Sequence, residues 1–226
     1  MKLIFQMFRM ALVSAILVAM SLSLSAAPMV VNGDFESETE GFAVWPGYVG
    51  GDNPAQIHGW VGTGGNGINP ISSDHESPAP FRDNGGNDTH VAFLQGASTL
   101  EQTVSGFVVG QDYIVTAQFN SRNCCGDFPI AEVYFNDELA GSSVDLFPPP
   151  GVVPPVGDEN PWYTVNIALT AETTDVDFRV QAAAGAGGDA TLLLDNVSIS
   201  IVPEPCSTSL IAIGLLGLVS LARRRS

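Results

Sequence analysis

Apolar and polar side chains alternate along much of the second half of the chain. The clearest example lies between residues 112 and 122, where the apolar positions include Tyr113, Val115, Ala117 and Phe119. A period of two is expected of a half-buried β-strand. The same reasoning predicts further strands, at Thr89–Gln95, Ser98–Val104, Ile130–Asn136, Trp162–Thr170, Asp175–Ala182 and Thr191–Val202.

The strand pattern predicts an all-β fold for residues 28–201. Between residues 28 and 202 we find no sustained helical stripe of apolar residues, which favours an antiparallel β-sandwich or barrel. The segment is longer than an immunoglobulin-like domain of about 100 residues, so it suits a larger jelly roll. Two stretches rich in Gly, Asn and Pro are predicted as long loops, Gly62–Asp88 and Asp145–Pro161.

The N-terminal segment Met1–Ala27 contains the three parts of a secretory signal peptide in their usual order. Lys2 and Arg9 precede the apolar run Ala11–Met20, and small residues follow at Ser25–Ala27. The alternative is a membrane anchor that stays on the protein. The order of these three parts predicts that the rest of the chain is exported.

The central segment is strongly acidic. The whole chain has a net charge of −16, but between residues 28 and 202 only Arg82, Arg122 and Arg179 oppose 23 carboxylates, which gives −20. A protein of this charge repels phosphate backbones, so nucleic-acid binding is excluded. The carboxylates serve solubility, the binding of calcium, or both.

The sequence carries none of the common catalytic signatures. It has no G-x-S-x-G elbow, no H-E-x-x-H, no P-loop and no dinucleotide fingerprint, so we predict that it is not an enzyme. Cys124 and Cys125 are neighbours that form either a vicinal disulfide or a bond between chains, while Cys206 lies in the tail. Its histidines do not stand at zinc-binding spacing.

Two short motifs bracket the central segment. VVNGDFES (Val30–Ser37) opens it and LLLDNVSISIV (Leu192–Val202) closes it. The pair resembles the first and last strands of galactose-binding-like jelly-roll domains, in particular bacterial carbohydrate-binding modules, whose sequences often begin near N-G-x-F-E and end near L-D-[DN]-V. The segment Gly106–Asn123 is similar to their turn, G-x-x-Y and strand. This resemblance implies a galactose-binding-like jelly roll over residues 28–201.

The resemblance also implies a structural calcium ion. Asp195 shares its parity with Val197 and Ile199, so we expect its carboxylate on the core side, where it needs a cation or several donors. The calcium ligands implied by the family are Glu36 and Asp195, with Asp34 as a substitute. The alternative is that Asp195 and Asn196 cap a turn before the strand.

A carbohydrate site needs exposed aromatic faces beside polar groups. The aromatic side chains that could supply such faces are Trp45, Tyr48, Trp60, Trp162 and Tyr163. Most of them are expected in the core, because large aromatics are usually buried. Trp45 and Tyr48, in a glycine-flanked loop, are therefore predicted to contact ligand. Arg122 and Asn123 form a second candidate; the alternative there is a tight turn at Gly126 with the adjacent cysteines as a staple.

The C-terminal segment 202–226 has three parts. A V-P-E-P motif is followed by an apolar run, Leu210–Ala222, and a basic end. The run is shorter than the roughly 17–25 residues of a spanning helix, and even from Ser207 it remains marginal. Its basic end would stop transfer on the cytoplasmic side. The motif and the basic end comprise Val202, Pro203, Glu204, Pro205, Arg223, Arg224 and Arg225.

This order closely resembles the PEP-CTERM sorting signal. The resemblance implies a short transmembrane helix that halts export at the inner membrane of Gram-negative bacteria. It also implies processing by an exosortase and delivery to the cell envelope, the outer surface or the extracellular matrix. Cys206 departs from the common form, in which Ser or Thr stands there.

Three functions are left open by the sequence. The first is an exported module that binds carbohydrate, either the cell's own exopolysaccharide or a foreign glycan. The second is a non-binding spacer of the cell surface or biofilm matrix. The third is a polysaccharide hydrolase that carries no recognised motif.

Overall fold

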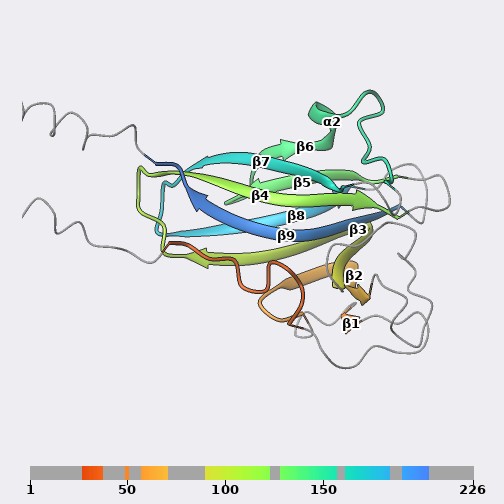
Figure 1. The fold of residues 1–226 in the computed structure, drawn as a ribbon, viewed down its shortest axis with the longest axis horizontal. Coiled ribbons are helices and arrows are strands. Elements are labelled where there is room, and N and C mark those ends of the chain that lie inside the picture. Colours follow the sequence, from red (N-terminus) through yellow and green to blue (C-terminus); the bar gives the residue numbers. More distant parts are fainter. Residues whose placement is uncertain are drawn as a thin grey trace, which may run out of the picture.

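The computed structural model describes residues 27–37, 49–50, 57–70, 90–122, 128–156, 161–183 and 190–203. These residues form antiparallel strands and one short helical turn (Figure 1). The all-β antiparallel prediction is therefore confirmed. The elements are β1 Val49–Gly50, β2 Val61–Pro70, β3 His90–Ser105, β4 Asp112–Ser121, β5 Ile130–Phe135, β6 Glu138–Ser142, α2 Ser143–Leu146, β7 Tyr163–Thr170, β8 Asp175–Ala183 and β9 Thr191–Ile201.

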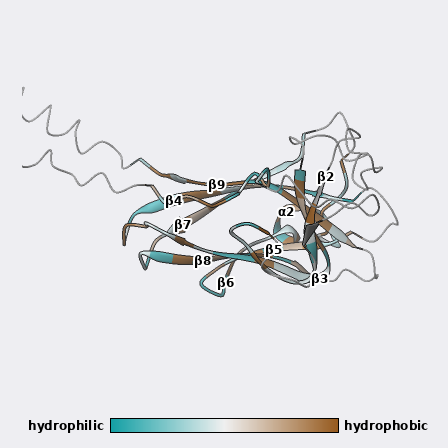
Figure 2. Cartoon of the chain, turned by 90° about the horizontal axis from the view of Figure 1, so that it is seen from below, coloured by the Kyte–Doolittle hydropathy of each residue, from teal (hydrophilic) through white to brown (hydrophobic). Residues whose placement is uncertain are grey.

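The long strand β3 connects two layers of one sheet. Residues 92–95 of β3 pair with β9, whereas residues 98–105 pair with β8. Gly96, between the two pairings, has a φ of 62°, which glycine adopts without steric cost. One layer continues through β8 and β5 to β6, and the other through β9 and β4 to β7. Seen edge-on, the layers face each other (Figure 2).

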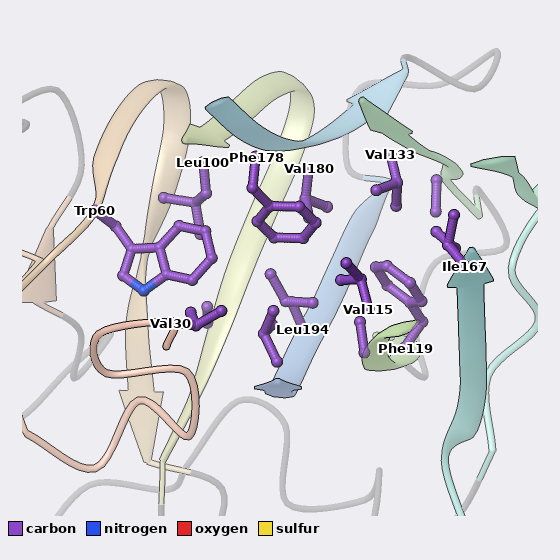
Figure 3. Close-up of a cluster of buried hydrophobic side chains, with 14 of the residues drawn as sticks. Val30, Trp60, Leu100, Val115, Phe119, Val133, Ile167, Phe178, Val180 and Leu194 are labelled. Carbon is purple, nitrogen blue, oxygen red and sulfur yellow. The ribbon is translucent and has the colours of Figure 1, made fainter. Parts of the chain in front are cut away.

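The core lies between the two layers (Figure 3). It includes fully buried side chains from both, among them Trp60, Leu100, Phe178 and Leu194. The ring of Trp60 packs edge-on against Phe178, with centroids 5.9 Å apart. Near α2, the side of the sandwich between β6 and β7 is covered by Phe147, whose ring meets that of Tyr163 at 4.9 Å.

The opening motif and the closing motif of the sequence are in contact. The N–H of Val197 in β9 donates to the carbonyl of Gly33 at 2.8 Å. A Cβ atom at Gly33 would overlap the carbonyl oxygen of Val197. Asn32 accepts a bond from the indole N–H of Trp60 at 3.1 Å through its carbonyl, and Gln102 of β3 bonds both the N–H and the C=O of Val31. The close approach explains why the opening motif carries glycine.

Two predictions were wrong in their bounds, one for the start of a loop and one for the division of a strand; residues 71–88 of that loop lie outside the described ranges. The predicted loop Gly62–Asp88 begins inside β2, where Asn66 and Ile68 are buried. Its glycines hide the apolar alternation, yet the extended backbone pairs with β3 over nearly its whole length. The two strands predicted at Thr89–Gln95 and Ser98–Val104 are one strand, because β3 bends at Gly96 without breaking.

The predicted signal peptide and most of the tail lie outside the described residues. Of them only Ala27, Val202 and Pro203 are described. Within the described ranges, none of the helical structure is long and apolar enough to cross a membrane.

Candidate functional site

The layer formed by β2, β3, β8, β5 and β6 presents a polar outer face. Along β5 and β8 every second side chain is buried, and the side chains between them face outward. Strand register then aligns the outward side chains in two adjacent rows that cross all five strands. We call them the tyrosine row, Leu139, Tyr134, Arg179, Glu101 and Val61, and the amide row, Ser142, Glu132, Gln181, Thr99 and Thr63.

Tyr134 lies at the centre of a set of polar contacts. Its hydroxyl donates to Oε2 of Glu132 at 2.8 Å, and Nε2 of Gln181 donates to the same oxygen at 3.2 Å. The guanidinium carbon of Arg179 stands 4.4 Å from the centroid of the tyrosine ring, a cation–π distance. Arg179 also donates to Asp137 at 2.6 Å. These contacts hold a half-buried ring in one orientation.

The phenol of Tyr134 stays neutral at physiological pH. The hydrogen bond that it donates to Glu132 raises its pKa above the ordinary value near 10. Desolvation and the negative charge of Glu132 act in the same direction, whereas the charge of Arg179 acts against them. The hydroxyl therefore remains a hydrogen-bond donor.

Carboxylates dominate the charge around these rows. Toward the β3–β4 turn, Thr103 donates to Asp177 at 2.6 Å, and Ser105 donates to Asp175. The hydrogen bonds from Ser105 and Thr174 lower the pKa of Asp175 below its ordinary value. On this outer face, the described carboxylates outnumber the one described cation, Arg179; they are Glu101, Glu132, Asp137, Asp175 and Asp177.

The outer face of the opposite layer has a different composition. There the register of β7, β4 and β9 aligns small polar groups such as Asn166, Thr116 and Ser198. Those positions offer hydrogen bonds but no aromatic ring. Among the described outward positions, an aromatic ring beside several fixed donors and acceptors therefore occurs on the Tyr134 side, a combination of groups suited to binding sugars.

Several of the side chains predicted to bind ligand lie outside the described residues. These are Trp45, Tyr48 and Asn123. The cysteines predicted to form a disulfide, Cys124 and Cys125, and the tail residues Glu204, Pro205 and Arg223–Arg225 lie outside the described residues as well. Arg122 is described: it is half-buried, and its main-chain N–H donates to the carbonyl of Thr191 at 3.0 Å. Trp60 and Trp162 are buried, as expected of large aromatics.

The three carboxylates predicted to bind calcium have separate surroundings. Both oxygens of Glu36 contact His90, one its N–H at 2.8 Å and the other its Nδ1 at 2.9 Å. Asp34 lines a shallow depression together with Asn196. Asp195 is fully buried. Among the described residues, no three His, Cys, Asp or Glu side chains converge on a possible ion position. Calcium binding by this set stays a prediction.

The interpretation of Asp195 as a core-facing strand residue needs a correction. Leu192 and Leu194 lie in the main core before it, and Val197 lies there after it. The alternation therefore shifts by one residue at Asp195 and Asn196, where the pairing with β4 is also irregular and Asn196 has a φ of 49°. A bulge at these two residues breaks the parity of the strand, so Asp195 does not share the core face of Val197.

Sequence reasoning missed the tyrosine row, although part of its signal is present. The alternation Ala131, Val133, Phe135 leaves Glu132 and Tyr134 on the opposite face of the same strand. The alternation in β8 likewise leaves Arg179 outward. What the pattern does not contain is the pairing of β5 with β8, which brings the two side chains together.

Comparison with known proteins gives weak structural likenesses only. No protein-family model and no curated protein matches the chain. A Stig cyclase, Fisc, from Fischerella sp. TAU is 16% identical, with 77% of this chain and 96% of that chain covered and a TM-score of 0.46. TmCBM61, in complex with β-1,4-galactotriose, is 12% identical, with 76% and 96% covered and a TM-score of 0.40. The CBM22-1–GH10 modules of Clostridium thermocellum xylanase 10B, complexed with xylohexaose, are 11% identical, with 66% and 27% covered and a TM-score of 0.42. These values do not assign a ligand to this chain.

Proposed function

We propose that this chain is a non-catalytic, exported protein whose β domain, a jelly roll of the galactose-binding kind, binds neutral polysaccharide. The binding surface is the outer face that carries the tyrosine row and the amide row. The observation that supports it is the fixed ring of Tyr134 between the polar groups of Glu132 and Arg179.

The geometry suits the two kinds of surface on a sugar. Apolar C–H groups of a pyranose pack against an aromatic face, and hydroxyls at the ring edge pair with planar carboxylate, amide and guanidinium groups. Glu132, Gln181 and Arg179 are already held by hydrogen bonds or stacking. Side chains ordered before binding lose less conformational entropy when a ligand arrives. Rows that run across five strands also offer several sugar positions to a chain ligand.

Charge determines which polysaccharides we expect to bind. The carboxylates around Arg179, in a central segment of net charge −20, repel uronate and sulfate groups. In retention assays on immobilised glycans, the purified segment 28–203 should be retained by neutral glucans, xylans or galactans and should pass through alginate or sulfated columns. Lowering the salt concentration should widen the difference, because the screening of charge weakens.

The same panel separates the alternatives. Equal passage through every neutral and charged column would leave the non-binding spacer as the better description. Release of reducing sugar from a retained polysaccharide would instead indicate a hydrolase. Retention by anionic columns at low salt would contradict the charge argument.

The rest of the proposed function concerns delivery. The signal-peptide pattern and the V-P-E-P, apolar and Arg-rich order support export through the inner membrane and processing by an exosortase. The partners are therefore the exosortase, the inner membrane transiently, and polysaccharide. The destination is the envelope or the extracellular matrix.

Calcium is a separate part of the proposal. If Glu36, Asp195 and Asp34 hold a structural ion with nearby carbonyl oxygens, calcium should raise the melting temperature of segment 28–203, because a ligand of the native state stabilises it. Magnesium at equal concentration serves as the control. Identical melting curves in calcium and in chelator would contradict calcium binding.

A further inference from the structure

Exposed apolar side chains gather at one end of the sandwich. Val108 and Val109, in the turn between β3 and β4, are 50% and 60% exposed, and Ile201 at the end of β9 is 46% exposed. The positions are neighbours, because Ile201 pairs in register with Tyr113, just after the turn. In Figure 1 the turn and the end of β9 lie at the same end of the molecule. We call these three residues the apolar end.

The turn that carries the two valines is held by hydrogen bonds and by packing beneath it. The N–H of Gln111 donates to the carbonyl of Val108 at 3.0 Å, and Gly110 has a φ of 83°, which is the pattern of a type II turn with Val109 at its tip. Below it, Phe107 is buried and packs edge-on against Tyr113 at 4.9 Å. The Tyr113 hydroxyl accepts from the N–H of Val108 at 2.9 Å. The fold therefore buries Phe107 and turns both valines outward.

The apolar end also differs in charge from its surroundings. The segments Ser105–Gln111 and Val197–Pro203 contain no charged residue, within a central segment of net charge −20. Carboxylates begin at its rim, with the exposed Asp112 and Glu172. An uncharged apolar tip ringed by carboxylates suits a surface that is apolar and not strongly anionic.

The tail leaves the fold from this end. Val202 is tied down by two hydrogen bonds, from its N–H to the carbonyl of Asp112 at 2.9 Å and from Nε2 of Gln111 to its carbonyl at 3.1 Å. Pro203 follows, and the apolar run begins at Leu210, or at Ser207 in its longer form. An extended chain of four to seven residues spans at most about 14–25 Å. A membrane that holds the run therefore lies close to the apolar end.

We propose that the apolar end contacts the bilayer surface while the tail is inserted, so that Val108, Val109 and Ile201 orient the sandwich on the membrane. This inference rests on the proposed membrane role of the tail. Three aliphatic side chains are too few to anchor the protein alone, but a tethered domain meets the surface at high effective concentration. The carboxylate rim makes zwitterionic lipid the preferred surface over anionic lipid.

The test uses the full chain in phosphatidylcholine vesicles. The three native cysteines, Cys124, Cys125 and Cys206, are first changed to Ser. An environment-sensitive dye is then attached at Val109→Cys or, as a control, at Val144→Cys. Val144 is 53% exposed, and its helix α2 lies toward the other end of the sandwich. Flotation first shows whether the tail holds the chain. We expect the dye at position 109 to shift to the blue and to be quenched by lipids spin-labelled at the headgroup, and the dye at position 144 to do neither.

A second measurement needs no substitution. Hydrogen exchange in the peptide covering residues 105–111 should slow on vesicles, and exchange in residues 143–147 should not. Equal behaviour of the two positions on floated protein would overturn the contact while leaving the tail proposal intact. A chain that does not float would overturn both. A blue shift that follows protein concentration in detergent would overturn the membrane contact in favour of a second copy of the chain.

Discussion

Gly33→Ala should destabilise the domain by about 3 kcal/mol. The added Cβ would overlap the carbonyl oxygen of Val197. Because the overlap is with backbone, it is relieved only if the opening segment moves away from β9. That movement weakens the bond between Val197 and Gly33 and exposes Phe35 and Trp60, both now buried. Urea unfolding followed by tryptophan fluorescence measures the change.

Gly96→Ala provides the matched control. Gly96 has a φ of 62°, but nothing lies within 4 Å of a Cβ placed there. Its substitution therefore carries the conformational cost of a positive φ alone, about 1–2 kcal/mol. If Gly33→Ala costs no more than Gly96→Ala, the opening segment packs less tightly on β9 than the structure shows.

The strands were the most predictable part of the fold. The predicted strands Asp112–Arg122 and Ile130–Asn136, for example, each end one residue beyond the observed strands β4 and β5. Each strand has one face in the core and one in solvent, so apolar and polar residues alternate along its sequence. The prediction failed where the side chains of a strand do not alternate between apolar and polar. The glycines of β2 carry no side chain to alternate, and its pairing with β3 is a long-range property.

The candidate site was less predictable for a physical reason. Tyr134 and Arg179 meet because β5 pairs with β8, and strand order follows from packing of the whole sandwich rather than from local pattern. The prediction for Asp195 failed for a related reason. Alternation places Asp195 on the core face only if the strand is regular, and the bulge at Asn196 interrupts the alternation. The contact of Gly33 with β9 likewise depends on distant residues.

Tyr134→Ala should weaken polysaccharide binding by roughly tenfold or more, equivalent to about 1.4 kcal/mol. The change removes the apolar face and also releases Glu132 and Arg179, which the ring now positions. Tyr134→Phe keeps the ring and loses only the hydroxyl bond to Glu132, so it should bind much more strongly than the alanine variant. Isothermal titration with a soluble oligosaccharide of the retained glycan measures both.

A control on the opposite layer makes the result specific to the tyrosine row. Asn166→Ala removes a polar side chain from an exposed position of β7, where it accepts a bond from Thr116 at 2.8 Å, and should leave the affinity unchanged. Both alanine variants are surface changes and should keep their cooperative unfolding, because neither opens the core. Equal affinity of Tyr134→Ala and the unmodified domain, with folding intact, would show that the sugar is bound elsewhere. Loss with Asn166→Ala alone would move the site to the β7–β4–β9 face, where hydroxyl and amide groups act without a ring.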